Sequence, residues 1–342
     1  MSGSSAESPA SGSRTGWPSD SAPAKSHRLR PGNTGALPAL FSADSRAAEC
    51  TLEFFTAHLR NPNTRKAYAR SVAAFASWCG RHGLGELPAV RPVHIAAWIE
   101  ERQETLAAPS VKQELAAVRM FFDWLVVGQI VPMNPASAVH GPRHIVRKGK
   151  TPVLSAGETR ELLDRIDTRS PSGLRDRALI ALLVYTFVRV GAAVKMRVED
   201  VYPQGRRLWV RLDEKGGKRH DMPCHHTLEA WLGAYLAGTG RATTPKAPLF
   251  PSLAGRTGQF SDTAMQPVDV WRMIRRRARA AGLPTRIGCH TFRATGITEY
   301  LRNGGKLEIA QQMANHESAR TTGLYDRRCD PVSLDEIERI RI

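Results

Sequence analysis

Apolar side chains recur at helical spacing through residues 46–139, and this pattern restricts the fold more than any other feature of the sequence. A helix with an apolar stripe must bury that stripe, so several such helices in succession must pack together. The clearest stripe begins at Ser110 and ends at Gly128. Its members are Val111, Leu115, Val118, Phe122 and Leu125.

Two earlier segments have the same periodicity. In the first, Asn63 or Thr64 is placed to cap a helix that ends at Gly80. The second covers residues 92–103. Stripes of this kind are core surfaces, so we expect this part of the chain to form a small helical domain with polar faces rich in Lys and Arg.

Two segments flank this domain and lack a sustained pattern of apolar side chains that could be buried. Residues 1–45 are rich in Ser, Pro, Gly and Ala, and we expect a disordered tail. Residues 140–153 contain Gly141, Pro142 and several cations, and we expect a basic interdomain linker. Such a linker either follows a DNA backbone or is a plain solvated connector.

Helical and strand patterns both occur in residues 154–342, which we expect to form a second domain. Ser155–Glu158 has the spacing of a capping box, and a later helix runs up to Arg189. A hairpin is expected between residues 207 and 223, with Lys215 in its turn. The sequence therefore predicts an α+β fold that is mainly helical with a small antiparallel sheet. Further helices are expected over residues 226–237, 267–281, 290–303, 306–314 and 320–325.

The chain has 49 Lys and Arg residues against 32 Asp and Glu, a net charge of +17. This excess favours a polyanionic partner, and nucleic acid is the first candidate, although a merely soluble basic protein has the same balance. Residues 271–282 place arginines at i, i+3, i+4 and i+7, on a face that either lies along DNA or is solvated. The side chains that we expect to contact DNA are Arg65, Lys66, Lys112, Arg143, Arg147, Lys148, Arg272, Arg275, Arg276 and Arg279.

Other classes of protein are disfavoured by what the sequence contains. The five cysteines are odd in number and scattered, which is typical of free thiols in a reducing cytoplasm. Cys224–His226 and Cys289–His290 lack the spacing of a zinc site, so we expect no metal. No apolar run approaches the roughly 18 residues of a membrane span. We therefore expect a soluble, cytoplasmic protein.

The second domain contains the groups needed to cut a phosphodiester: a nucleophile, cations for the phosphate oxygens and a proton donor for the leaving oxygen. Tyr325, nine residues after His316, is a candidate nucleophile, but a phenol with a pKa near 10 must be activated by its site. His290 and Arg293 lie three apart, so on a helix they reach the same ligand. Arg293 presents a two-pronged fork to phosphate oxygens.

Each of these residues also has an ordinary structural explanation when taken alone. A tyrosine in a helix usually belongs to the core or the surface, and His-x-x-Arg spacing arises often by chance. Arg189 follows an apolar helix, where an ion pair explains a charge as well as a bound anion does. Lys215 lies at the tip of a Gly-rich hairpin, where it is either a proton donor or an ordinary turn residue.

As an ordered set, however, these residues resemble the tyrosine recombinase (phage integrase) family, from about residue 47 to residue 329. Members carry, in order, an arginine after a helix, a lysine on a hairpin, His-x-x-Arg, a His or Trp, and the nucleophilic tyrosine. The resemblance implies an N-terminal helical, SAM-like core-binding domain and an integrase-type catalytic domain that form a C-shaped clamp on DNA. The matching residues are Arg189, Lys215, His290, Arg293, His316 and Tyr325.

The resemblance also implies a reaction at double-stranded DNA recombination sites. Tyr325 would attack the scissile phosphate, giving a 3′-phosphotyrosyl intermediate and a free 5′-hydroxyl. No metal or nucleotide cofactor is implied, because the phosphotyrosine conserves the bond energy for rejoining. Four protomers would act on two sites through a Holliday junction, with the free protein monomeric or weakly associated. In the roles implied, Arg189 and Arg293 clamp the phosphate, His290 assists proton transfer, His316 hydrogen-bonds the phosphate and Lys215 protonates the leaving oxygen.

The chain departs from the family pattern near its first arginine. Many relatives have Gly-Leu-Arg followed two positions later by Ser-Glu, whereas this chain has Phe187–Arg189 and then Gly191 and Ala192, so the glutamate is absent. This favours an integrase of a mobile element over a housekeeping Xer resolvase. After the nucleophile, apolar residues spaced by three from Leu334 predict a last helix that docks on a neighbouring protomer or on its own domain.

Two other functions share these features. A type IB topoisomerase uses the same chemistry to relax supercoils without exchanging strands. A non-catalytic DNA-binding accessory protein has the same scaffold, but it has no use for the complete set of six residues ending at Tyr325. The sequence therefore predicts a site-specific recombinase.

Overall fold

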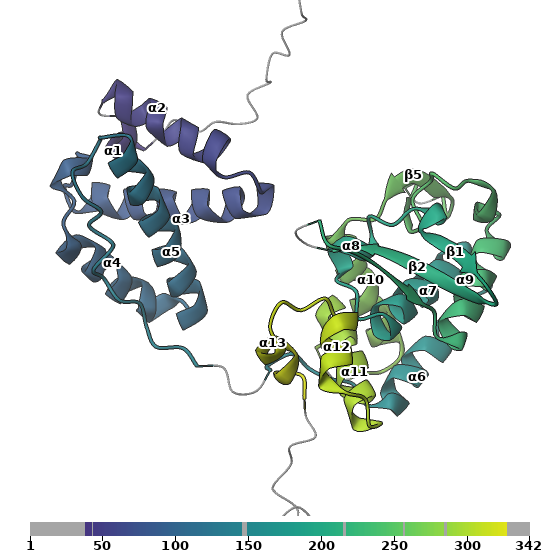
Figure 1. The fold of residues 1–342 in the computed structure, drawn as a ribbon. Coiled ribbons are helices and arrows are strands. Elements are labelled where there is room, and N and C mark those ends of the chain that lie inside the picture. Colours follow the sequence, from purple (N-terminus) through teal and green to yellow (C-terminus); the bar gives the residue numbers. More distant parts are fainter. Residues whose placement is uncertain are drawn as a thin grey trace, which may run out of the picture. The chain divides into compact units, whose positions relative to one another are not determined.

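The structure, a computed structural model, describes residues 38–42, 44–145, 149–214, 217–255, 257–283 and 286–326. It consists of two compact units that divide between His144 and Ile145 (Figure 1). Each unit has its own buried core, so each is considered by itself. The structure is mainly helical with small antiparallel sheets, which confirms the predicted fold class.

The first unit is a helical domain whose long helices pack around aromatic side chains. Phe75 lies against Trp98 and Phe122, and Phe54 lies against Phe121, with ring centroids 5.1–6.1 Å apart. Its elements are α1 (Ala39–Ser42), α2 (Ser45–Glu53), the π-helix η1 (Phe54–His58), α3 (Pro62–Arg81), the 3₁₀-helix η2 (Leu87–Ala89), α4 (Pro92–Thr105) and α5 (Ala108–Val127).

Two boundaries in this unit differ from those predicted. The cap of α3 is Asn61, not Asn63 or Thr64, because the Asn61 side chain accepts hydrogen bonds from both of those backbone N–H groups. The folded part also begins before residue 45, since α1 buries Leu40 and Phe41 in the core. A four-residue helix is too short to show a periodic apolar pattern, so it could not be predicted from periodicity.

The second unit contains a three-stranded antiparallel sheet, in the order β1–β2–β3, and a separate β4–β5 pair (Figure 1). The β2–β3 hairpin is confirmed. The other strands were not predicted, because three to five residues show too little alternation. The elements are α6 (Ala156–Asp164), α7 (Pro171–Tyr185), α8 (Val190–Ala193), η3 (Val198–Asp200), β1 (Val201–Gln204), β2 (Arg207–Asp213), β3 (Arg219–Pro223), α9 (His226–Gly238), η4 (Arg241–Thr243), β4 (Pro251–Leu253), β5 (Phe260–Ala264), α10 (Pro267–Ala280), α11 (Cys289–Arg302), α12 (Leu307–Met313) and α13 (Ala319–Gly323).

The helix α7 is the central support of this unit. It begins at a cap from Ser170, ends at Tyr185 and packs against α9 and α11. The predicted extension of this helix up to Arg189 was wrong, because Phe187 has a φ of 56° and turns the chain away. The buried carboxylate of Asp176 accepts hydrogen bonds from Arg175 and Arg277, and the second of these ties α7 to α10.

Candidate active site

Tyr325 lies just beyond the end of α13, not within a helix as predicted, and its side chain is buried, with 7% exposed. The Thr298 hydroxyl of α11 donates a hydrogen bond of 2.9 Å to the Tyr325 carbonyl. The Tyr325 backbone N–H donates to the carbonyl of Thr322. These contacts fix the tyrosine backbone against α11, the helix that also carries His290 and Arg293.

The Tyr325 hydroxyl lies 2.6 Å from Nε2 of His290. Burial raises the pKa of the tyrosine, while the charges of Arg293 and Arg189 act in the opposite direction. His290 remains accessible to solvent. Partial desolvation of its ring, and then the charges of Arg293 and Arg189, lower its pKa. A neutral imidazole is therefore placed to accept the phenolic proton.

His316 stacks on the Tyr325 ring, with centroids 5.7 Å apart and planes 7° apart. Its Nδ1 lies 2.9 Å from the hydroxyl of Thr322. His316 is preceded by Asn315, which has a φ of 46°. Asparagine adopts this left-handed conformation more readily than most residues. Burial, followed by the charges of Arg293 and Arg189, lowers the pKa of His316 to about 3, so the ring is neutral at ordinary pH.

Arg293 is the most deeply buried cation of the group, with 1% of its side chain exposed. Its guanidinium donates to the backbone carbonyls of Phe187 and Ala314, which follow α7 and α12. Burial, and next the charge of Arg189, lower its pKa to about 10. It is therefore still a cation at neutral pH, and it joins the segments that carry the other site residues.

Arg189 lies in the extended segment before α8, with 37% of its side chain exposed. Its backbone N–H and its Nη1 both donate to the buried carboxylate of Glu214, at 3.1 and 2.8 Å. Reasoning from the sequence missed Glu214. A carboxylate directly before the predicted proton donor Lys215 was the available signal. Lys215 itself lies outside the described residues.

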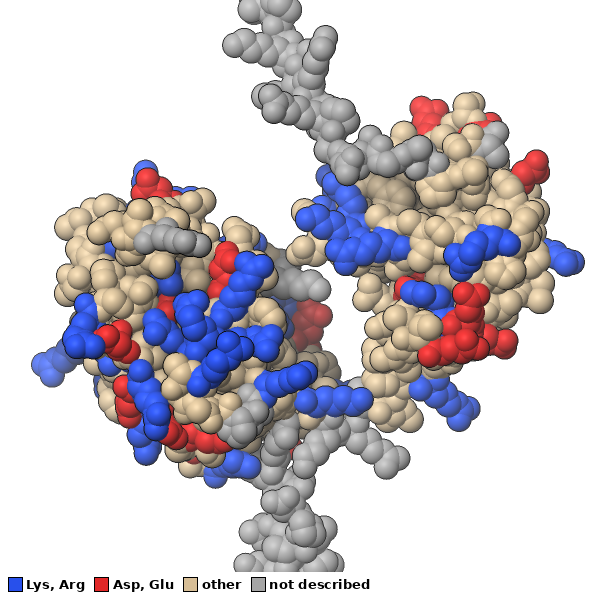
Figure 2. Space-filling view, turned by 180° about the vertical axis from the view of Figure 1, so that it is seen from behind, with Lys and Arg blue, Asp and Glu red and all other residues tan. Residues whose placement is uncertain are grey.

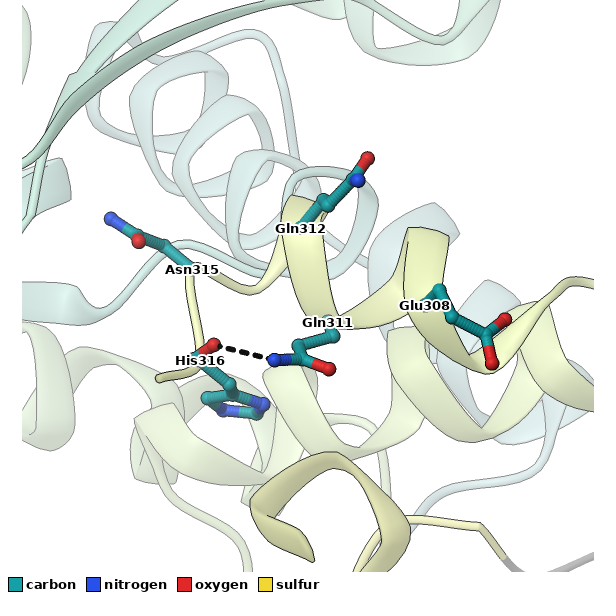
Figure 3. Close-up of a pocket in the computed structure, with 5 residues that line it drawn as sticks. All are labelled: Glu308, Gln311, Gln312, Asn315 and His316. Atoms are coloured by element: carbon teal, nitrogen blue, oxygen red, sulfur yellow. Dashed lines mark hydrogen bonds between the residues drawn. The ribbon is translucent and has the colours of Figure 1, made fainter. Parts of the chain in front are cut away.

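A hollow of about 430 Å³ adjoins His316. Figure 3 shows that its lining side chains come from α12 and from the turn that leads to His316. All are polar, and the amide of Gln311 donates to the His316 carbonyl, at 3.1 Å. This contact supports the backbone on which His316 is presented. The lining residues are Glu308, Gln311, Gln312, Asn315 and His316.

The basic residues expected to contact DNA fall into different environments. In the first unit Lys66 and Lys112 are exposed, as is Arg143 after α5, whereas Arg65 donates to the carbonyls of Leu59 and Thr56 and so closes the end of η1. Figure 2 shows Lys and Arg side chains gathered over both units. The expected contacts Arg147 and Lys148 lie outside the described residues.

The helix α10 presents an exposed basic face on a buried apolar side. Arg275 lies over the Trp271 ring at 4.8 Å, and Arg272 pairs with Asp269 at 3.1 Å. Arg276 is 3.9 Å from the buried Asp176. A groove of about 330 Å³ runs beside this face, and the arginines that line it are Arg275, Arg279 and Arg286, the last of which was not predicted.

The Cys224 and His225 side chains of the second unit lie in ordinary packing environments. The described ranges hold no cluster of three or more His, Cys, Asp or Glu side chains placed to bind a metal ion. Cys224 is buried, and burial raises the pKa of its thiol to about 12, while His225 stacks on Tyr185. In the same ranges, no helix combines the length and the apolar character that crossing a bilayer requires.

The arrangement unites a buried phenol, two histidines and two arginines, and comparison with known proteins identifies the scaffold. Residues 152–330 match the profile of the phage integrase family, and residues 53–128 match that of the N-terminal SAM-like domain of phage integrases. The chain belongs to the phage integrase family. It is a tyrosine-type site-specific DNA recombinase, as predicted.

Curated relatives of this recombinase span most of its length. It is 29% identical to the tyrosine recombinase XerD of Chlorobaculum tepidum over 80% of this chain and 90% of that protein. It is 26% identical to the tyrosine recombinase XerC of Xylella fastidiosa, covering 77% of this chain and 85% of that one. These names favour recombination over the topoisomerase and accessory-protein alternatives.

Solved structures share the fold at lower sequence identity. The XerH site-specific recombinase bound to a palindromic difH substrate matches with a TM-score of 0.67 and 18% identity, over 89% of this chain and 90% of that one. A lambda integrase dimer bound to a core site matches with a TM-score of 0.64 and 17% identity, over 85% and 98%. Each of these likenesses shows the fold alone.

Proposed function

We propose that this recombinase cleaves DNA with Tyr325 as the nucleophile and His290 as the group that receives its proton. The observation that carries the proposal is the 2.6 Å contact between the phenol and Nε2 of His290. Burial and the charges of Arg293 and Arg189 lower the pKa of His290 and so favour its neutral imidazole. Attack on the phosphorus gives a 3′-phosphotyrosyl bond and releases the 5′-oxygen, which takes a proton to leave as a hydroxyl.

The remaining site residues act on the phosphate. Arg189 and Arg293 neutralise charge that gathers on the non-bridging oxygens, and the neutral ring of His316 donates a hydrogen bond to one of them. Lys215 supplies the proton to the leaving oxygen. No cofactor is required, because the covalent phosphotyrosine retains the energy of the cut bond and the free 5′-hydroxyl of a partner strand reverses the reaction.

Four protomers act together on two double-stranded recombination sites in the cytoplasm, and the free protein is monomeric or weakly associated. A lambda integrase tetramer bound to a Holliday junction shares the fold of this chain, which supports that assembly. The helical domain predicted over residues 46–139 and the catalytic domain predicted from residue 154 both bind the DNA. The basic segment between them and the α10 arginines lie on its backbone. The absence of the usual glutamate at Ala192 supports a mobile element as the carrier.

The test is a nicked suicide duplex carrying the recombination site, mapped from the insertion junctions of the element. Cleavage on such DNA releases a short fragment, so the covalent adduct cannot reverse. We expect the wild type to accumulate an adduct on a denaturing gel and Tyr325→Phe to form none. The control is Tyr300→Phe, which removes a hydroxyl outside the site. An adduct in the Tyr325 variant would refute the assignment of the nucleophile.

A further inference from the structure

We propose that Glu214 is a positioning residue for this reaction, which holds Arg189 ready for the scissile phosphate. This inference rests on the proposed function, because it takes Arg189 as a phosphate ligand. Glu214 follows the last residue of β2, and its side chain is 2% exposed. A carboxylate this deeply buried needs partners that repay its lost hydration.

Arg189 donates two hydrogen bonds to this carboxylate. Its backbone N–H donates to one carboxylate oxygen of Glu214 at 3.1 Å, and its Nη1 donates to the other at 2.8 Å. The carboxylate therefore fixes both the main chain and the head group of the arginine. The other guanidinium N–H groups of Arg189 make no hydrogen bond to the residues that the structure describes. They are the donors that remain for a phosphate.

Charge gives a second reason for the pairing. Glu214 also lies 3.9 Å from Nη1 of the buried Arg293. Burial and then the charge of Arg189 lower the pKa of Arg293, and the Glu214 carboxylate acts in the opposite direction. Before DNA binds, no phosphate offsets the repulsion between two neighbouring arginines. Glu214 offsets it in the free protein, so the cations are already in place when the phosphate arrives.

The sequence also differs from many relatives close to Arg189. Where many relatives carry a glutamate three residues after this arginine, the chain has Ala192, which is buried in α8. In this chain the carboxylate that pairs with Arg189 comes instead from the end of β2, 25 residues along the sequence. The hydrogen bonds between Glu214 and Arg189 link the end of β2 to Arg189. Glu214 directly precedes Lys215 in the sequence.

The experiment measures adduct formation by the full-length protein on the nicked suicide duplex, with either a normal scissile phosphate or a methylphosphonate. The methyl group removes the negative charge that Arg189 neutralises, so a defect in placing Arg189 matters less on this substrate. We expect Glu214→Gln to form adduct about 10- to 100-fold more slowly on phosphate, the range seen when a residue that orients a ligating side chain is removed. On methylphosphonate its rate returns to within about threefold of wild type.

Two further variants make the result interpretable. Arg189→Ala should show the same recovery on methylphosphonate, and Glu199→Gln, which changes an exposed glutamate, should match the wild type on both substrates. A Glu214 variant at the wild-type rate, or equally slow on both substrates, would overturn the positioning role. If the wild type itself forms no adduct, the proposed function fails and this inference falls with it.

Discussion

Phe187 lies two residues beyond the end of α7 and has a backbone conformation that is unusual for phenylalanine. The sequence shows Phe-Val-Arg where many relatives have Gly-Leu-Arg. In the structure Phe187 has a φ of 56°, a region that glycine enters freely and that costs other residues on the order of 1 kcal/mol. Its ring is buried in the cluster that contains Tyr325, so packing offsets the strain. Phenylalanine therefore occupies a backbone conformation that glycine would adopt at lower cost.

At the same scale, the state of His290 predicts how cleavage responds to pH. In the proposed reaction only the neutral imidazole accepts the proton of Tyr325, and the pKa of His290 is lowered from its ordinary value of about 6.5. Activity is therefore fully present above that value and is lost as the pH falls through the lowered pKa. We expect single-turnover cleavage to be unchanged between pH 8 and about 6.5 and to decline below it.

The control for this prediction is His290→Gln, which keeps an acceptor that does not titrate. This variant should be slower at every pH and should lack the acid decline. A wild-type midpoint above the ordinary histidine value, or the same decline in the variant, would show that another group limits the rate.

Between elements, the approach of α11 to α7 brings His290 and Arg293 near the segment that carries Arg189. The approach depends on Gly296: a Cβ there would lie 2.1 Å from the carbonyl oxygen of Val184 and 2.7 Å from the Phe187 ring. The residue lies within a helix, where glycine is otherwise unfavourable. Its small size, not a special backbone conformation, explains its presence.

Gly296→Ala should therefore destabilise the second unit by about 1–3 kcal/mol, the usual cost of overpacking a core. Urea denaturation followed by circular dichroism measures this. The matched control is Gly233→Ala in α9, where a Cβ meets no atom within 4 Å, and it should stabilise by about 0.5–1 kcal/mol. Equal effects of the two substitutions would mean that the contact between α7 and α11 has room for the added methyl group.

For the whole molecule, net charge sets how strongly DNA is held. The chain carries +17, and the proposed DNA contacts add up over both units. Binding through phosphates releases counterions, so affinity falls steeply with salt. Local position still matters, because Arg275 and Arg279 line one groove beside α10. The guanidinium of Arg65 donates to backbone carbonyls, so we expect Arg65 to contribute less.

The double variant Arg275→Ala and Arg279→Ala should weaken DNA binding and lower the slope of log K against log salt by about 2, one unit for each phosphate that is no longer neutralised. Fluorescence anisotropy over a salt series measures the slope. The control removes two charges elsewhere, at Arg160 in α6 and at Arg165, which directly follows that helix. An equal change in the control would show that net charge, not the α10 groove, determines the slope.

Local patterns in the sequence were enough to predict the long amphipathic helices and the β2–β3 hairpin, and the order of Arg189, Lys215, His290, Arg293, His316 and Tyr325 was enough for the resemblance to the family. The boundary of α7, the short strands and the cap at Asn61 were missed because few residues specify them. The contacts of Tyr325 with His290 and of Glu214 with Arg189 became visible only in the folded chain. Those partners are 35 and 25 residues apart, and no periodicity in a sequence encodes a distance between side chains of different elements.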